Sequence, residues 1–232
     1  MINRPTVVPV ADHSVLVVFA EEFNTVALSR IHALDAAIAM NPPKGLTEVV
    51  PALVNLLVRF DPFATDHAAI TAGVLALLDV PPTEVSGRHH TIEVCYDAPH
   101  APDLAVVAQR TGLPLDAVIE QHLEGAYRVG MYGFAPGFAY LYGTPAAIGL
   151  PRNPTPGPSV PAGSVIIAAQ QCIVTPTDMS TGWFAIGRSS AEMLLRHEER
   201  PFRFDVGDTV SFSRINAARL DDQFAQRATD TR

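Results

Sequence analysis

The sequence predicts an α+β protein with two domains, a small N-terminal domain of strands and helices followed by a β-barrel. Three observations support this division. Strand-like and helix-like segments alternate up to residue 78, residues 79–90 (DVPPTEVSGRHH) form a polar, proline-containing linker, and many short β-like runs follow residue 125. We expect an N-terminal domain at 1–85, a barrel domain at 86–220 and a C-terminal tail at 221–232.

The N-terminal domain is expected to have the order ββαββα. Residues 6–20 contain two β-rich runs separated by the polar segment ADHS, a pattern typical of a hairpin. A helix is expected after Asn24, because apolar residues recur at helical spacing from there. Residues 46–60 indicate two strands with a proline break between them, and residues 66–78 indicate a second helix.

The second domain begins with an alternating strand at residues 91–96. Two short helices are expected at 103–112 and 114–123. Frequent Gly and Pro then separate short β-like runs, which favours a barrel. These runs are AYRVGMYGF, VPAGSVIIAAQQCIVT, GWFAIG, FRFDV and DTVSFSRI.

Composition limits the function classes. The 232-residue chain is 48% hydrophobic and 17% charged, as in soluble globular proteins, and its formal charge of −8 argues against nucleic-acid binding. It has no apolar run long enough for a membrane helix and no secretion signal at its start, so a cytoplasmic location is expected. Cys95 and Cys172 are far apart and outside any CxxC spacing, and no histidine motif suggests a metal site.

One window of this acidic chain is net positive. Between Gly125 and Ala191 the only acid is Asp178, whereas three arginines fall in the same window, so an anionic ligand is expected there. Lys44 is the only lysine, and the chain has no GxxxxGK[ST] motif, so it shows no familiar ATP site.

Several residues could carry chemistry. His122 falls on the inward face of the second short helix, where it is either a core histidine or a general acid or base. The loop GFAPGFAYLYG, residues 133–143, could wall a ligand pocket or close the barrel. Arg152 lies in a proline-rich loop and could bind a carboxylate or phosphate, or be an exposed arginine on a rigid connector. Gln171 is either a pocket hydrogen-bonding group or an ordinary barrel residue.

The segment HLEGAYRVGMYGFAPGFAYLYGTPAAIGLPR, followed by VPAGSVIIAAQQ and GWFAIGR, resembles the signature of the 5-oxoprolinase B-subunit family, also called the allophanate hydrolase subunit 1 or kinase A inhibitor family. The likeness is specific over residues 118–215. It implies a cyclophilin-like β-barrel after the N-terminal domain, and a heteromer with a homologous second subunit of the C type and a third of the A type. Such a complex opens 5-oxoproline to glutamate with ATP, whose site on this chain is unknown. Two alternatives are a carboxyltransferase-like subunit that acts on urea or a related amide, and a regulator that inhibits a sensor histidine kinase.

The resemblance also implies roles for individual residues. His122 would transfer protons, Arg152 or Arg188 would anchor an anion, and Gln171 would recognise an amide. The remaining substrate-binding candidates are Tyr127, Phe134, Pro136, Gly137, Phe138 and Arg188. The chain departs from the family pattern at Gly157, Ala169 and Thr175, and has MSTGW where the family has SPGGW. Another lactam, amide or urea-like substrate is therefore an alternative.

Overall fold

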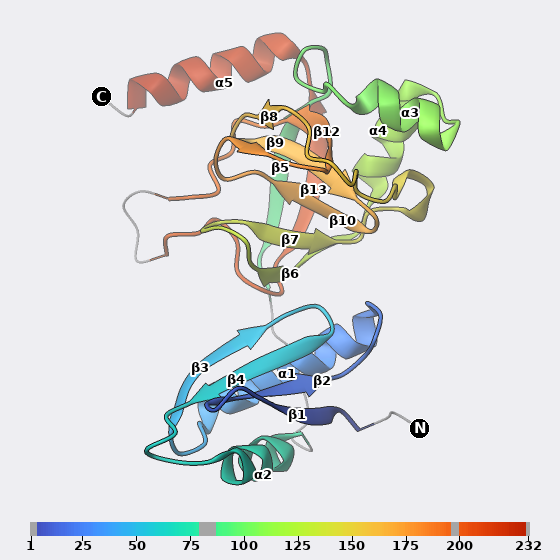
Figure 1. Cartoon of the computed structure of the whole chain (residues 1–232). Helices are drawn as coiled ribbons and strands as arrows, with labels where there is room; N and C mark the ends of the chain where they lie inside the picture. Colours follow the sequence, from blue (N-terminus) through green and yellow to red (C-terminus); the bar gives the residue numbers. More distant parts are fainter. Residues whose placement is uncertain (1–3, 79–86, 196–199, 231–232) are drawn as a thin grey trace. The chain divides into compact units, whose positions relative to one another are not determined.

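The computed structural model describes residues 4–78, 87–195 and 200–230 (Figure 1). The chain divides into two compact units, residues 1–85 and 86–232. Part of the predicted linker, residues 79–86, lies outside the described residues. The mixture of helices, an open sheet and a closed barrel confirms the predicted α+β class.

Unit 1 has the ββαββα order. Its elements are β1 (Thr6–Val10), β2 (Ser14–Val18), α1 (Thr25–Met40), β3 (Leu46–Pro51), β4 (Asn55–Phe60) and α2 (His67–Leu77). The strands form an antiparallel sheet in the order β1-β2-β4-β3. Both helices begin at a capping side chain: Asn24 accepts from the N–H of Ala27, and Asp66 accepts from the N–H of Ala69, each at 2.8 Å.

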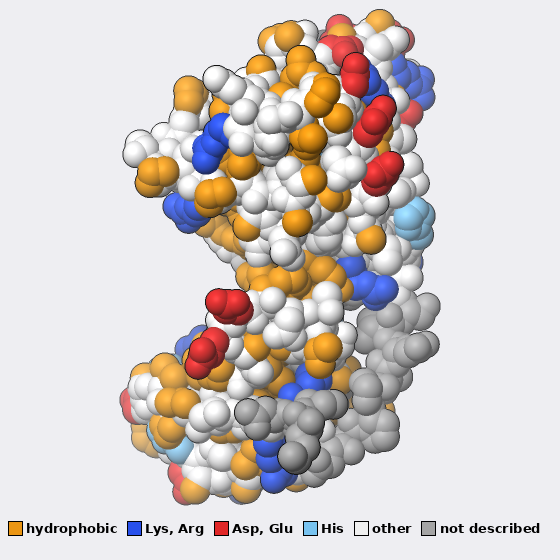
Figure 2. All heavy atoms as spheres, turned by 90° about the vertical axis from the view of Figure 1, so that its right-hand side faces the viewer, with side chains coloured by type: hydrophobic (Ala, Val, Ile, Leu, Met, Phe, Trp, Pro, Cys, Tyr) orange, Lys and Arg blue, Asp and Glu red, His pale blue; other side chains and the backbone are white. Residues whose placement is uncertain are grey.

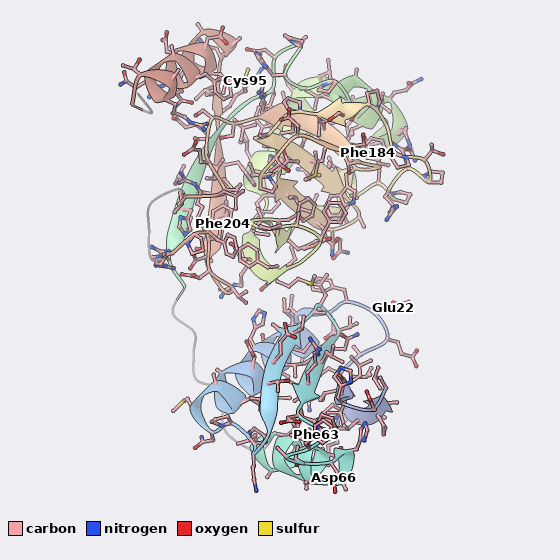
Figure 3. The ribbon with its side chains drawn as sticks, turned by 60° about the vertical axis from the view of Figure 1, so that its left-hand side comes forward. Glu22, Phe63, Asp66, Cys95, Phe184 and Phe204 are labelled. Carbon is pink, nitrogen blue, oxygen red and sulfur yellow. The ribbon has the colours of Figure 1, made fainter. Side chains whose placement is uncertain are left out.

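The core of unit 1 lies between the sheet and its two helices. Ile31 on α1 and Val74 on α2 are fully buried against Val17 on β2 and Val58 on β4. Both helices therefore cover one face of the sheet. On the turn before α2, where Figure 3 labels Phe63 and Asp66, the Phe63 side chain is 98% exposed.

Unit 2 is built on a closed barrel of seven strands in the order β10-β7-β6-β13-β5-β12-β9. Strands β5 and β13 pair in parallel, whereas the other neighbours pair antiparallel. The barrel strands are β5 (His89–Cys95), β6 (Tyr127–Tyr132), β7 (Ala139–Tyr142), β9 (Ser164–Ala168), β10 (Gln171–Val174), β12 (Phe184–Arg188) and β13 (Thr209–Ile215). The other elements are helices α3 (Leu104–Thr111), α4 (Leu115–Glu124) and α5 (Ala217–Asp230), the short 3₁₀ turn Ala146–Ile148, and a small hairpin of β8 (Ser159–Val160) and β11 (Met179–Ser180).

Successive side chains along each strand point alternately into and out of the barrel. The inward ones fill its interior, and some outward ones form a second apolar cluster on its outer surface. Val165 and Ile167 of β9 belong to the interior cluster, together with Phe184 and Phe204, both labelled in Figure 3. Ile166, between the two β9 residues, belongs to a separate outer cluster. Helices α3 and α4 lie side by side along the barrel and add apolar side chains to the interior cluster (Figure 1).

Three segments of unit 2 differ from expectation. The predicted strand FRFDV is wrong, because this segment forms only an isolated bridge between Phe202 and Leu194, while Phe204 turns into the core. The glycine-rich loop at 133–143 is a loop only in its first half, since β7 occupies the second half. The expected tail contains most of α5, which packs through the buried Leu220. Asn216 starts this helix by accepting from the N–H of Arg219 at 2.9 Å.

The surface of unit 2 carries scattered apolar and charged groups. On the face of unit 2 in Figure 2, arginine side chains lie among apolar and acidic ones, so this face offers no continuous basic surface for nucleic acid. Within the described ranges, no helix combines the length and apolarity needed to cross a membrane.

Candidate functional site

The structure separates the predicted site residues into three places. His122 and Tyr127 lie inside the barrel, whereas Phe138 belongs to the apolar cluster on its outer wall. Arg188 lines a cavity beside α5. The residues that the resemblance groups as one site are therefore divided between the barrel core and the surface of unit 2.

His122 is held in the barrel core by contacts at both ring nitrogens. Its Nδ1 lies 2.8 Å from the hydroxyl of Tyr96, and its Nε2 lies 3.6 Å from Sγ of Cys172. Tyr127 donates to the backbone oxygen of His122 at 3.0 Å, and the ring of Phe212 lies 4.5 Å from the His122 ring. This is the environment of a core histidine with satisfied partners.

Burial changes the acid–base behaviour of this group. The side chain of His122 has no exposed surface, and burial lowers its pKa from 6.5 to about 3, so the ring is neutral at pH 7. Burial also raises the pKa of Tyr96, Tyr127 and Cys172. The geometry thus favours the structural alternative for His122 over proton transfer to a surface-bound substrate.

An aromatic row marks the outer wall of the barrel. We use this name for Phe134, Phe138, Tyr140 and Trp183. Consecutive ring centroids along the row are 5.1, 5.2 and 6.0 Å apart, with tilted or edge-to-face geometry. Its inner members pack on the outer cluster, which Ile166 and Ile173 supply from β9 and β10.

The loop at residues 133–138 holds the exposed end of this row in place. Phe134 has a φ of 68°, which is unusual for a residue with a side chain, and it is 79% exposed. Gly137 also has a positive φ of 73°, and a Cβ there would lie 2.8 Å from a methyl carbon of Leu194. Pro136 lies exposed between them. The loop therefore presents an aromatic side chain to solvent at the expense of backbone strain.

Arg152 joins this surface from the proline-rich loop. Burial raises the pKa of Tyr140, and the nearby positive charge of Arg152 opposes that rise. The loop is tied to the segment before Trp183, because the N–H of Asn153 donates to the Gly182 oxygen at 2.7 Å. Arg152 is thus exposed beside the aromatic row, and the hydrogen bond of the next residue, Asn153, fixes the backbone at this point.

Gln171 lies on the same outer wall. It pairs with Tyr142 of β7 and Ala168 of β9, whereas the next residue, Cys172, faces the interior. Because side chains alternate along a strand, Gln171 faces outward on the same side as Tyr140. The outer wall therefore combines aromatic surface, an arginine and an amide, which suits a small polar ligand with one negative charge.

Two residues that contact the predicted site residues carry no signal in the sequence. Tyr96 as the partner of His122, and Phe224 as the ring beneath Arg188, lie far away in the sequence and no motif signals either pairing. Tyr140 and Trp183, in contrast, belong to segments that the sequence already indicates, the glycine-rich loop GFAPGFAYLYG and the motif GWFAIGR. Over the described part of the chain, no group of three or more His, Cys, Asp or Glu side chains is placed to hold a metal ion.

Comparisons with known proteins identify the family of the chain. The model of the family described as "Carboxyltransferase domain, subdomain C and D" matches residues 5–204. The B subunit of 5-oxoprolinase from Bacillus subtilis (strain 168) is 34% identical over 230 residues, covering 93% of this chain and 95% of that protein.

Solved structures share the fold. The crystal structure of TTHA0988 superposes with a TM-score of 0.78 at 34% identity, covering 89% of this chain but 40% of that one, so this chain spans less than half of its length. The urea carboxylase of Kluyveromyces lactis has a TM-score of 0.73 at 15% identity, covering 95% of this chain and 24% of that one, which shows a shared fold alone. From the family match and the near full-length similarity, the chain belongs to the 5-oxoprolinase B-subunit family and carries carboxyltransferase subdomains C and D.

Proposed function

We propose that this chain is one component of an ATP-dependent complex that hydrolyses the cyclic amide 5-oxoproline to glutamate. The observation that carries the proposal is the 34% identity to a protein named as the B subunit of 5-oxoprolinase, which extends over 93% of this chain. Similarity of this extent includes both units and not the barrel alone.

The outer wall of the barrel is the substrate-facing surface in this proposal. The aromatic row supplies flat apolar contacts for a lactam ring, and Gln171 and Arg152 supply an amide and a positive charge on the same wall. His122 and Tyr127 act indirectly, because their packing holds β6 and α4 against the barrel core.

ATP binds to another subunit in this proposal. The chain has a single lysine, Lys44, which lies exposed in the turn between α1 and β3. No glycine-rich phosphate-binding motif precedes it. The partners expected from the resemblance, which are a homologous barrel subunit plus a third subunit, therefore supply the nucleotide site.

The exposed end of the aromatic row is the proposed contact with the second barrel subunit. Phe134 projects from a strained loop and is 79% exposed, a position that favours a partner or ligand covering it in the complete complex. In a site completed by two subunits, the partner would supply the proton-transfer group, because His122, the candidate on this chain, lies buried in the barrel core.

The test is ATP-dependent turnover of 5-oxoproline by this chain co-expressed with its partner subunits. Glutamate formation should require ATP and all subunits. Urea, allophanate and other lactams serve as competing substrates in the same assay. Absence of turnover of 5-oxoproline by a folded complex would overturn the proposal, and turnover of another of these compounds would redirect it.

A carboxyltransferase-like reaction on urea or a related amide is a second candidate. The matched family model, which bears a carboxyltransferase description and covers residues 5–204, favours it. Transfer of a labelled carboxyl group to urea without net lactam opening would distinguish this reaction from hydrolysis. Binding to a histidine kinase, with none of these turnovers, would instead support the regulatory alternative.

A further inference from the structure

A second place in unit 2 has the features of a ligand site. A cavity of about 700 Å³ lies between loops at the ends of barrel strands and helix α5. Its barrel side comes from three segments, residues 162–163, 175–177 and 188–194, and its helix side comes from Phe224, Arg227 and Ala228. A cavity of this volume accommodates a small organic molecule.

Among the residues that line the cavity, Arg188 is a positively charged side chain without an ion pair in the described part of the chain. It is the last residue of β12 and pairs with Ser164 and Cys95 on the two neighbouring strands, β9 and β5. Its guanidinium carbon lies 4.8 Å from the ring centroid of Phe224, so the ring supports one face of the guanidinium plane. Its Nε is buried, and among the described residues it has no hydrogen-bond partner. Because Arg188 lines the cavity, its charge favours a ligand that carries a negative group.

The second arginine of the cavity is already paired. Arg227 of α5 donates to the backbone oxygen of Ser190 and to a carboxylate oxygen of Glu192. Glu192 is the only acid among the lining residues. Arg188 makes no ion pair with any residue in the described ranges, so it is the positive charge that remains available to a ligand.

The backbone brings these segments together at a glycine. Gly163 has a φ of 83°, and a Cβ at this position would lie 2.2 Å from the backbone oxygen of Ser189. The N–H of Ser189 donates to the Gly163 oxygen at 2.8 Å, and the N–H of Gly163 donates to the Thr175 oxygen at 2.8 Å. The segment that carries Arg188 is therefore fixed before any ligand binds.

We propose that this cavity binds the carboxylate of a small organic acid, with Arg188 as its anchor. The planar guanidinium suits a carboxylate, which accepts from two N–H groups at once. A phosphate dianion fits less well, because Glu192 faces the same space and only one arginine is unpaired. The other lining groups, among them Pro176, Met193 and Leu194, are largely apolar and suit the body of the molecule.

The inference deepens the proposed function and rests on it for the identity of the ligand. Both 5-oxoproline and glutamate carry a carboxylate beside a small polar body. The cavity also adjoins the loop of the aromatic row, since Gly137 packs against Leu194 and Pro176, which line the cavity. A ligand that shifts Leu194 or Pro176 would therefore also change the packing of the loop that carries Phe134.

Binding is tested on the full chain alone, without ATP or partners. Calorimetric titration uses 5-oxoproline, glutamate, the uncharged lactam 2-pyrrolidinone and inorganic phosphate. We expect 5-oxoproline or glutamate to bind and 2-pyrrolidinone and phosphate to bind at least about tenfold more weakly. Arg188→Gln should weaken carboxylate binding about tenfold or more, and Arg188→Lys should restore it only in part. Arg214→Gln, which removes an arginine paired with Asp116 outside the cavity, should leave it unchanged.

The outcomes separate the two proposals. Carboxylate binding without turnover by the complete complex supports the cavity and counts against the proposed reaction. Equal binding of 5-oxoproline and 2-pyrrolidinone, or carboxylate binding that is unchanged in a folded Arg188→Gln chain, overturns the cavity as a carboxylate site. If Arg188→Gln fails to fold, Phe224→Leu is the second variant, because it removes the ring on α5 that stacks on the Arg188 guanidinium. This variant should weaken carboxylate binding as well. Unchanged binding would overturn the proposal.

Discussion

The hydroxyl of Tyr96 lies 2.8 Å from Nδ1 of His122, inside the barrel and far from solvent. Tyr96 directly follows β5 and His122 lies on α4, so the contact joins the barrel wall to the helix that covers it. Because both side chains are buried, each depends on the other for this hydrogen bond. The histidine that the sequence suggests as catalytic is therefore first a structural element of the core.

Removing the hydroxyl of Tyr96 should destabilise the protein. Tyr96→Phe leaves Nδ1 of His122 without this partner, and we expect the free energy of unfolding to fall by about 1–3 kcal/mol. Urea unfolding followed by circular dichroism measures the change. Tyr140→Phe is the matched control: Tyr140 is half-buried on the outer wall, so its change should stay within about 0.5 kcal/mol. Equal losses in both variants would contradict the structural role of the contact.

The buried imidazole should make stability depend on pH. The pKa of His122 is lowered from 6.5 to about 3 in the folded chain, so below pH 6.5 the unfolded chain takes up a proton that the folded chain does not. The contribution is fully present above pH 6.5 and is lost as the pH falls toward 3, at about 1.4 kcal/mol per pH unit. Urea unfolding at several pH values measures the slope. His122→Gln should flatten it by that amount, and an unchanged slope would contradict this account.

Much of unit 1 is predictable because its signals are local. Asn24 and Asp66 stand at the capping positions of α1 and α2, and the apolar period of each helix is visible in the chain itself. The turn ADHS likewise separates two strands that pair with each other. Each of these features depends on neighbours within a few residues, which a single sequence displays.

In unit 2, several features depend on contacts between distant parts of the chain and could not be predicted from local patterns. The parallel pairing of β5 with β13 joins residues more than a hundred positions apart, and no local pattern specifies it. The same holds for the stacking of Arg188 on Phe224. His122 was correctly expected on the inward face of its helix, but whether that face meets a pocket or a closed core depends on Tyr96 and Cys172, which the topology brings together.

Arg152 should affect the activity of the complex without affecting stability. Its side chain is exposed beside Tyr140, so Arg152→Gln should change the free energy of unfolding by no more than about 0.5 kcal/mol. If it attracts an anionic substrate to the outer wall, the KM for 5-oxoproline should rise about tenfold. Steady-state kinetics of the reconstituted complex measures this. Arg214→Gln should leave KM unchanged, and similar kinetics for both variants would remove Arg152 from the site.

Phe134 offers a test that separates stability from function at a single position. Its φ of 68° strains any residue with a Cβ, whereas glycine adopts this conformation freely. Phe134→Gly should therefore be more stable than Phe134→Ala by about 1 kcal/mol, as measured by urea unfolding. Both variants remove the exposed ring and should weaken binding of the partner barrel subunit to a similar extent, as measured by co-purification and calorimetry.

The comparison of the two Phe134 variants isolates the role of the ring. If glycine gains stability over alanine while both lose partner binding, the native chain retains a strained backbone in order to present an aromatic side chain, as the proposed interface requires. If glycine gains no stability, the loop accommodates its conformation without strain. If both variants bind the partner normally, the exposed ring serves another purpose, and the second subunit must contact a different surface of unit 2.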